Sequence, residues 1–178
     1  LGFVGVPDWP APGGSVTGIV NLPPGDFLLL DVFGGRGVAR TTAVGEPEAV
    51  DEPTTDLTVT LKDMTIDLPE AAFSSQPLRW RIGNIGSVPH DVAVVAVADD
   101  LTEDDLLWLL SLPDDATPTP DGPWIDYQPV AAIGVLAAGG TSWLDVQLPP
   151  GRYVGICMLP FGTGYPHAMD GMFVFFDV

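Results

Sequence analysis

The sequence predicts an all-β fold with one short helix, and three observations support this prediction. The 178 residues include 21 glycines and 19 prolines, which interrupt short apolar segments along the whole chain. Several of these segments alternate apolar and polar side chains, as expected of a half-buried strand. Only one segment, residues 102–112, has the pattern of an amphipathic helix.

The expected strands follow the apolar segments in chain order. In the clearest one, Leu57, Val59 and Leu61 alternate with polar residues. Near the C-terminus, two prolines and Gly151 follow an apolar segment, so we expect a tight turn and a hairpin there. The expected strands cover residues 16–21, 26–33, 57–62, 77–83, 91–98, 130–135, 141–148, 152–158 and 172–178.

The expected helix has clear signals at both ends. Thr102 precedes three acidic residues, which resembles a capping box and places negative charge at the positive end of the helix dipole. Leucines then follow at helical spacing, from Leu106 to Leu110. The helix is expected to end before Pro113.

Charge and cysteine content exclude several classes of function. The chain has 24 acidic and 6 basic residues and a formal net charge of −18, so its surface repels nucleic acid and anionic lipid. No apolar run reaches the roughly 18 residues that a membrane helix needs. A single cysteine rules out an internal disulfide. The first residue is Leu1 rather than methionine, so we expect a processed or excised product.

Residues able to bind a metal gather near the C-terminus. Cys157 ends an expected strand, His167 follows on a loop, and Met172 opens the last strand, while His90 lies upstream after a proline. A thiolate, two imidazoles and a weak thioether form the ligand set of a trigonal copper site with a long axial bond. Met169 is the competing axial candidate, since it also follows His167 closely.

Zinc is the alternative metal, because one cysteine, two histidines and water resemble a catalytic zinc site. The methionine argues against zinc, since a thioether is a poor zinc ligand. His90 and His167 are the only histidines in the chain, which excludes an additional type 2 or trinuclear copper centre. Met158, next to the cysteine, is expected to point away from it and to pack elsewhere.

Three stretches of this sequence resemble the cupredoxins, the family of plastocyanin and azurin. Residues 84–91 contain an Asn, a Gly and a Pro-His pair, as in the family's first-ligand segment. His167 and Met172 keep the family's spacing of five, and residues 148–153 resemble the turn and strand before the cysteine. The resemblance implies a Greek-key β-sandwich with the helix at 102–112 as an insertion.

The same resemblance implies the ligand roles and the function. His90, Cys157 and His167 would be the equatorial ligands of one copper ion, and Met172 the axial one. The ion would cycle between Cu(I) and Cu(II), so the protein would be an electron carrier rather than an enzyme. It would work outside the cytoplasm with a redox partner protein, whose surface would be cationic to match the acidic chain.

The resemblance also leads to expectations about the surroundings of the copper. Asn84 is expected to brace the His90 loop against the Cys157 loop, and Asp91 is a second candidate for this role. The solvent-facing edge of His167 is expected to be the electron port, within an apolar rim of neighbouring residues. These rim residues are Phe161, Tyr165, Pro166 and Ala168.

One feature departs from the family and keeps other functions open. Nine residues separate Cys157 from His167, far more than in plastocyanin-like proteins, so the site could be more open to water or substrate. A small copper redox enzyme is therefore one alternative. The others are a copper carrier without redox turnover and a structural β-sandwich module with an incidental site.

An internal repeat suggests how the chain is organised. Residues 13–27 match residues 139–153 at a constant offset of 126, which places Asp31 where Cys157 stands in the second copy. We therefore interpret residues 1–50 as the last strands of a degenerate, metal-free repeat, or as extra strands on the main sheet. Residues 55–178 form the copper-binding domain, and residues 46–55 resemble a linker.

Overall fold

The computed structural model describes residues 3–5, 15–30, 38–45, 51–69, 76–113, 123, 129–160, 162 and 164–178. The chain forms two units. The main unit combines Leu1–Val20 with Thr54–Val178, and the second unit is Asn21–Pro53. The expected linker at 46–55 lies partly outside the described residues. Asp31 also lies outside them.

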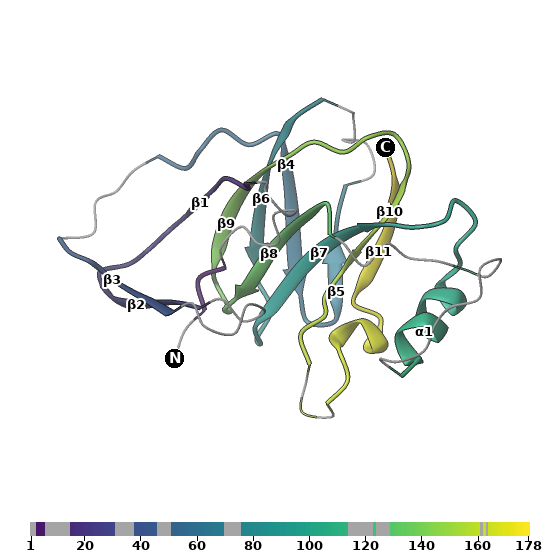
Figure 1. Cartoon of the computed structure of the whole chain (residues 1–178). Coiled ribbons are helices and arrows are strands. Elements are labelled where there is room, and N and C mark those ends of the chain that lie inside the picture. Colours follow the sequence, from purple (N-terminus) through teal and green to yellow (C-terminus); the bar gives the residue numbers. More distant parts are fainter. Residues whose placement is uncertain are drawn as a thin grey trace. The chain divides into compact units, whose positions relative to one another are not determined.

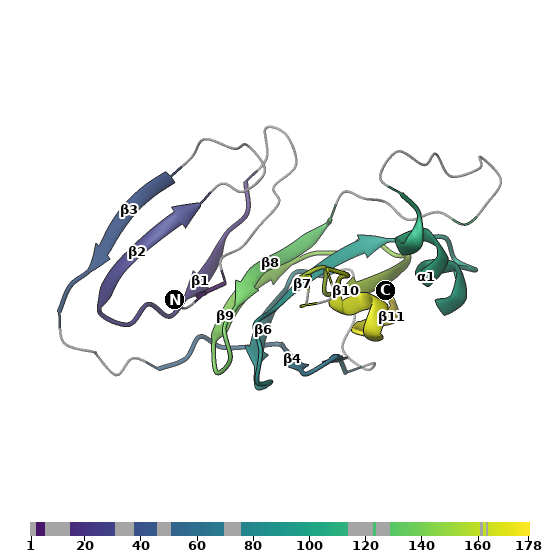
Figure 2. The same ribbon diagram turned by 90° about the horizontal axis from the view of Figure 1, so that it is seen from below.

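Within the described residues, the main unit contains two sheets and one α-helix (Figure 1). The first sheet has the strand order β1-β9-β6-β4-β5, and the second has the order β11-β10-β7-β8. Figure 2 shows the two sheets as separate layers. Their strands are β1 (Gly18–Val20), β4 (Leu57–Lys62), β5 (Thr65–Asp67), β6 (Leu78–Asn84), β7 (His90–Ala96), β8 (Ala131–Leu136), β9 (Thr141–Val146), β10 (Arg152–Ile156) and β11 (Phe173–Asp177). The all-β sandwich with one short helix is therefore confirmed.

The core between the sheets follows from the alternation in the sequence. Leu57, Val59 and Leu61 of β4 are buried in it, as predicted. Strand β7 contributes alternate residues to this core and turns the others to the outer face of its sheet. Because both faces of β7 and β10 are covered, these strands have nearly continuous apolar sequences.

The helix α1 (Glu103–Ser111) covers the outer face of the second sheet. Leu106 and Leu109 pack there in one cluster with Val95 and Val154. Thr102 caps the helix as predicted: its hydroxyl accepts a hydrogen bond from the Asp105 N–H, and the Asp105 carboxylate accepts one from the Thr102 N–H. The predicted helix is thus confirmed.

The prolines after β9 do not form the expected hairpin. Strands β9 and β10 belong to different sheets, so the segment between them crosses from one sheet to the other. The Tyr153 hydroxyl donates a hydrogen bond of 2.8 Å to the Pro149 carbonyl and holds this crossing. Two consecutive prolines signal a change of direction, but they do not determine which strand becomes the neighbour.

The repeated segment is divided between the two units. In the main unit, β1 pairs antiparallel with β9, and Gly18 lies opposite Leu144, its own counterpart in the repeat. In the second unit, β2 (Gly25–Leu30) pairs antiparallel with β3 (Val38–Ala43). Strand β2 corresponds to β10 in the repeat, and β10 pairs with β11 in the same antiparallel way. The strands β3 and β5 were not predicted from the sequence.

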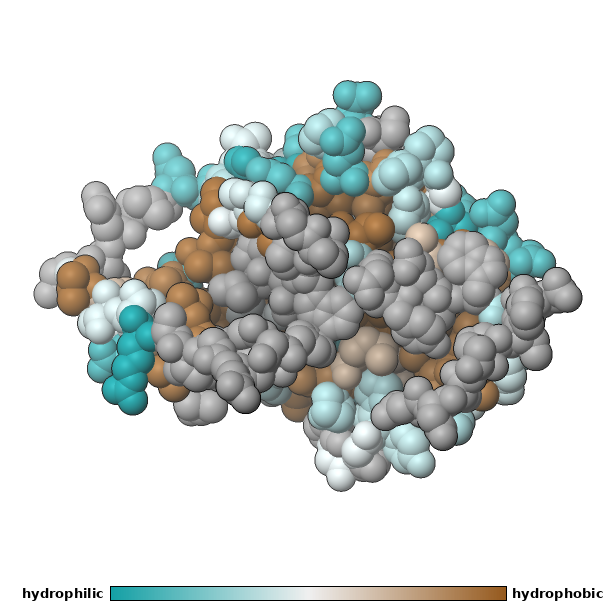
Figure 3. Space-filling model, in the orientation of Figure 1, coloured by the Kyte–Doolittle hydropathy of each residue, from teal (hydrophilic) through white to brown (hydrophobic). Residues whose placement is uncertain are grey.

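The described surface is mixed in polarity. Figure 3 shows hydrophilic side chains gathered at the upper edge of one face and apolar residues nearer its centre. Among large apolar side chains of the main unit, Ile85, Tyr165 and Trp108 are well exposed. No helix in the described part of the chain is long and apolar enough to cross a membrane.

Candidate metal centre

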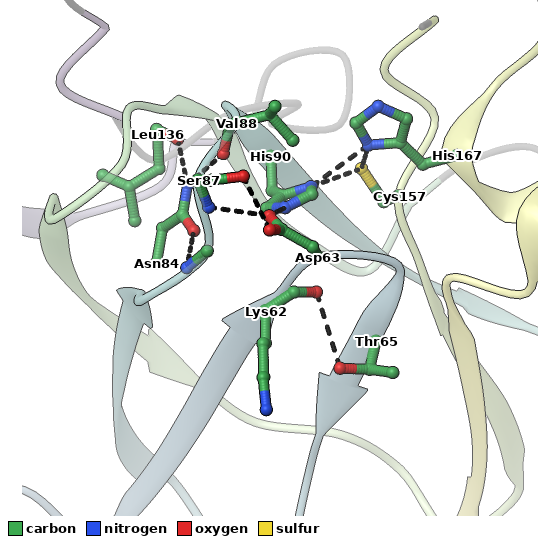
Figure 4. A network of polar contacts seen from close by, with 11 residues as sticks. Lys62, Asp63, Thr65, Asn84, Ser87, Val88, His90, Leu136, Cys157 and His167 are labelled. Carbon is green, nitrogen blue, oxygen red and sulfur yellow. Dashed lines mark hydrogen bonds and ion pairs between the residues drawn. The ribbon is translucent and has the colours of Figure 1, made fainter.

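Three predicted ligands meet in one buried cluster. His90 is the first residue of β7, Cys157 directly follows β10, and His167 opens the short 3-10 helix η2 (His167–Asp170). The Nδ1 atoms of the two histidines are 3.1 Å apart. The Cys157 Sγ atom lies 3.4 Å from Nδ1 of His167 and 4.0 Å from Nδ1 of His90 (Figure 4). All three residues are at most 1% exposed.

The sheet and a few backbone hydrogen bonds bring these residues together. Strands β7 and β10 are antiparallel neighbours, so the start of β7 lies beside the end of β10. The Cys157 N–H donates to the Met172 carbonyl at 3.1 Å, and the Cys157 carbonyl accepts from the Ala168 N–H at 3.0 Å. The Met172 N–H donates to the His167 carbonyl at 3.1 Å. Backbone hydrogen bonds therefore fix the segments that carry Cys157, His167 and Met172 relative to one another.

The long loop between Cys157 and His167 is closed at its base. The His167 N–H donates to the Leu159 carbonyl at 3.0 Å, and Pro160 and Pro166 form an isolated antiparallel bridge. These contacts at the base keep the two ligands close despite the nine residues between them. Since both ligands are buried, the described residues do not support the more open site that the loop length suggested.

Burial distinguishes the three methionines near the cluster. Met172 is completely buried and belongs to the same apolar cluster as Cys157. Met169 lies on η2 and is only partly buried. Met158 is 44% exposed, so it points away from Cys157 as expected, but it does not pack into the core. Burial therefore favours Met172 over Met169 as the axial candidate.

The two candidate braces make different contacts. The buried Asn84 amide donates to the carbonyls of Val88 and Leu136, both at 2.9 Å, and its oxygen accepts from the Gly86 N–H. These bonds hold the loop before His90 against β8, rather than against the Cys157 loop as expected. Sequence proximity showed that Asn84 belongs to the His90 loop, but not which strand lies beside it.

The bond to the Cys157 loop comes from Asp91. Its carboxylate accepts a hydrogen bond of 2.9 Å from the Met158 N–H. Burial raises the pKa of Asp91, whereas its hydrogen bonds with Cys157 and the following backbone lower it. Asp91 therefore joins the start of β7 to the segment that follows β10.

Burial also shifts the pKa values of Cys157 and His90. It raises the pKa of the Cys157 thiol, and the nearby Asp91 carboxylate adds to this effect. Burial lowers the pKa of His90, although Asp63 opposes the shift. Both shifts favour the neutral forms of the Cys157 thiol and the His90 imidazole in the metal-free protein, and a bound cation would replace the thiol proton.

The surroundings of His167 differ from those predicted for the electron port. The His167 ring is only 1% exposed, so its edge does not face solvent. Ala168 is fully buried and is not a rim residue, whereas Tyr165 is 64% exposed and Pro166 is half-buried. Phe161 lies outside the described residues.

Asp63 is a neighbour of the cluster that sequence reasoning missed. One of its carboxylate oxygens lies 3.5 Å from Nε2 of His90, on the side of the ring away from the cluster (Figure 4). The two residues are far apart in the sequence, and no local pattern links them. The pairing of β4 with β6 brings them together.

The donor set fits a copper site. Two imidazole nitrogens and one sulfur converge with all ligand atoms within 4.8 Å of one another, and a buried thioether follows in the chain. Soft sulfur ligands combined with imidazole suit copper, whereas structural zinc sites use four strong ligands.

The comparisons with known proteins found structural likenesses at low sequence identity. No family model and no curated protein matches the chain. Among solved structures, it is similar to a dithionite-reduced auracyanin from the photosynthetic bacterium Roseiflexus castenholzii, with 21% identity and a TM-score of 0.47 over 71% of this chain and 98% of that one. It is also similar to auracyanin B, with 22% identity and a TM-score of 0.44 over 72% and 93% of the two chains.

The structure itself confirms the resemblance to the cupredoxins that the sequence indicates. The chain forms the expected all-β sandwich. Within it, His90, Cys157 and His167 form the expected cluster of nitrogen and sulfur ligands.

Proposed function

We propose that this chain is a type 1, or blue, copper protein that transfers single electrons. His90, Cys157 and His167 would hold the ion, and Met172 would supply a weak fourth ligand. The observation that carries the proposal is the convergence of two imidazole Nδ1 atoms and one thiol in a buried cluster. Copper bound there supplies a one-electron Cu(I)/Cu(II) couple.

The protein contributes a preformed and dry binding site. Backbone hydrogen bonds join the Cys157, His167 and Met172 segments, so the ligands need little rearrangement when the charge of the ion changes. Burial of all four side chains would limit the access of water to a bound ion. These properties favour electron transfer over an open redox enzyme or a carrier that exchanges its copper readily.

The partner is a second redox protein, and the place of work is outside the cytoplasm. The formal net charge of −18 favours a partner with a cationic surface. Exposed apolar side chains on the loops beside the cluster, such as Ile85 and Tyr165, suit a short-lived contact. Electron exchange should then slow as ionic strength rises, because salt screens the attraction. A rate independent of salt would exclude this steering.

Copper binding is tested by adding Cu(II) to the full chain and recording its visible and electron paramagnetic resonance spectra. We expect an intense thiolate-to-copper charge-transfer band, which Cys157→Ser abolishes. Met158→Ser is the matched control, because it changes the exposed neighbour and should keep the band. The proposal is wrong if copper does not bind, or if the band survives in Cys157→Ser.

A further inference from the structure

The side of the His90 ring that faces away from the cluster lies against a carboxylate. Nδ1 of His90 faces Cys157 and His167, while Nε2 lies 3.5 Å from the Oδ1 atom of Asp63. Nε2 is buried and has no well-formed hydrogen bond to a described residue. At 3.5 Å, the Asp63 contact is electrostatic rather than a short hydrogen bond.

The topology of the first sheet creates this contact. Strands β4 and β6 are parallel, with Leu61 opposite Asn84. The turn after β4 and the loop after β6 therefore emerge at the same end of the sheet, and the Ile85 N–H donates to the Leu61 carbonyl at 2.8 Å. Asp63 lies on this turn, and His90 follows the loop. The pairing of β4 with β6 therefore brings Asp63 and His90 together.

The Asp63 carboxylate is held in place on both of its oxygens. Its Oδ1 accepts a hydrogen bond of 2.7 Å from the Ser87 N–H, and its Oδ2 accepts one of 2.7 Å from the Ser87 hydroxyl. These two bonds lower the pKa of Asp63, with the hydroxyl as the larger cause. The group near His90 is therefore an oriented anion (Figure 4).

Gly86 leaves the space that this arrangement needs. A Cβ atom at this position would clash with the Asp63 carboxylate and lie 3.1 Å from Nε2 of His90. A larger residue would therefore push the carboxylate and the imidazole apart. The close approach of Asp63 to His90 therefore depends on a glycine at position 86. This is a second observation, besides the hydrogen bonds of Ser87, that supports a specific contact.

We propose that Asp63 is a positioning residue for His90 that favours the oxidised form of the bound metal. The negative charge beside Nε2 favours the tautomer with its proton on Nε2, which leaves Nδ1 free for the metal and favours this orientation of the ring. As an anion, the carboxylate also increases the electron density of the imidazole, which stabilises Cu(II) more than Cu(I). This inference rests on the proposed copper site.

A merely structural role for Asp63 makes a different prediction. If Asp63 only joined the β4–β5 turn to the Ser87 loop, its removal would lower the stability of the fold. It would not change the reduction potential of the bound metal. The reduction potential and the His90 tautomer separate these two roles, because neither responds to stability alone.

The test compares Asp63→Asn with Asp67→Asn in the full chain. Asp67 is exposed on the same β4–β5 hairpin, so its variant removes the same charge while leaving His90 untouched. We expect Asp63→Asn to weaken Cu(II) binding by about 10-fold to 100-fold, as for other partners of metal-bound histidines. Cu(I) binding should change less, so the reduction potential rises. Asp67→Asn should change neither value appreciably.

A second measurement does not need copper. In the metal-free protein, ¹⁵N NMR of the imidazole should show the Nε2–H tautomer of His90, and Asp63→Asn should weaken this preference. Equal potentials and equal tautomers in the two variants would overturn the role of Asp63 and leave the copper site intact. If the unmodified chain binds no copper, the proposed function fails and the role of Asp63 at the metal fails with it, even where the tautomer preference is seen.

Discussion

Replacement of Asn84 by alanine should be among the most damaging single changes at the cluster end of the sandwich. The side chain is 1% exposed and makes three hydrogen bonds of 2.9 Å, two as donor and one as acceptor. Each bond contributes about 1 kcal/mol net, and each buried group left without a partner costs about 1–3 kcal/mol. The two effects overlap, so we expect a loss of about 3–5 kcal/mol in the free energy of unfolding.

Urea unfolding of the metal-free protein measures this loss directly. Asn21→Ala is the matched control, since Asn21 is exposed, and it should change stability by less than about 0.5 kcal/mol. Asn84→Asp adds a sharper comparison, because a carboxylate keeps the size of the side chain but cannot donate to the carbonyls of Val88 and Leu136. It should therefore also destabilise the protein strongly. A loss below about 1 kcal/mol in Asn84→Ala would refute the reasoning.

Two further predictions concern the axial ligand and the helix. In the copper-loaded protein, Met172→Leu should shift the reduction potential and the paramagnetic resonance spectrum, whereas Met169→Leu should leave both unchanged; the reverse result would assign Met169. Thr102→Ala should lower the free energy of unfolding, measured by urea unfolding, by about 1 kcal/mol. An unchanged value would show that the cap does not contribute to stability. Because the Thr102 hydroxyl lowers the pKa of Asp105 below 3.8, this part of the cap acts above pH 3.8 and is lost as the pH falls through the folded-state pKa. Stability measured against pH should show that loss in the unmodified chain and not in Asp105→Asn.

The local parts of the fold could be predicted because their signals are local. The alternation in 57–62 and the cap at Thr102 depend on residues close together in the chain, and both match the structure. The short strand β5 was missed because three residues are too few for a periodic pattern. The crossing at Pro149 was taken for a hairpin because turn residues do not encode the sheet to which the next strand belongs.

The same difference between local signals and the packing of distant segments applies to the candidate site. His90, Cys157 and His167 could be found because metal ligands are chemically distinctive and rare in this chain. The burial of His167 and the contact of Asp63 with His90 could not, because both depend on how distant segments pack. The base of the long loop was also hidden, since a bridge between two prolines leaves no pattern in the sequence.

The pairing of β1 with β9 has a consequence for self-association. Strand β9 would otherwise be the edge of its sheet, with a row of unpaired backbone groups. Gly18 and Leu144 are counterparts in the repeat, so the antiparallel pair has the local symmetry of a contact between two copies of one strand. Any event that detaches β1 would therefore expose an edge already suited to a strand of its own kind. Strand β1 therefore protects β9 from pairing with a strand of another molecule.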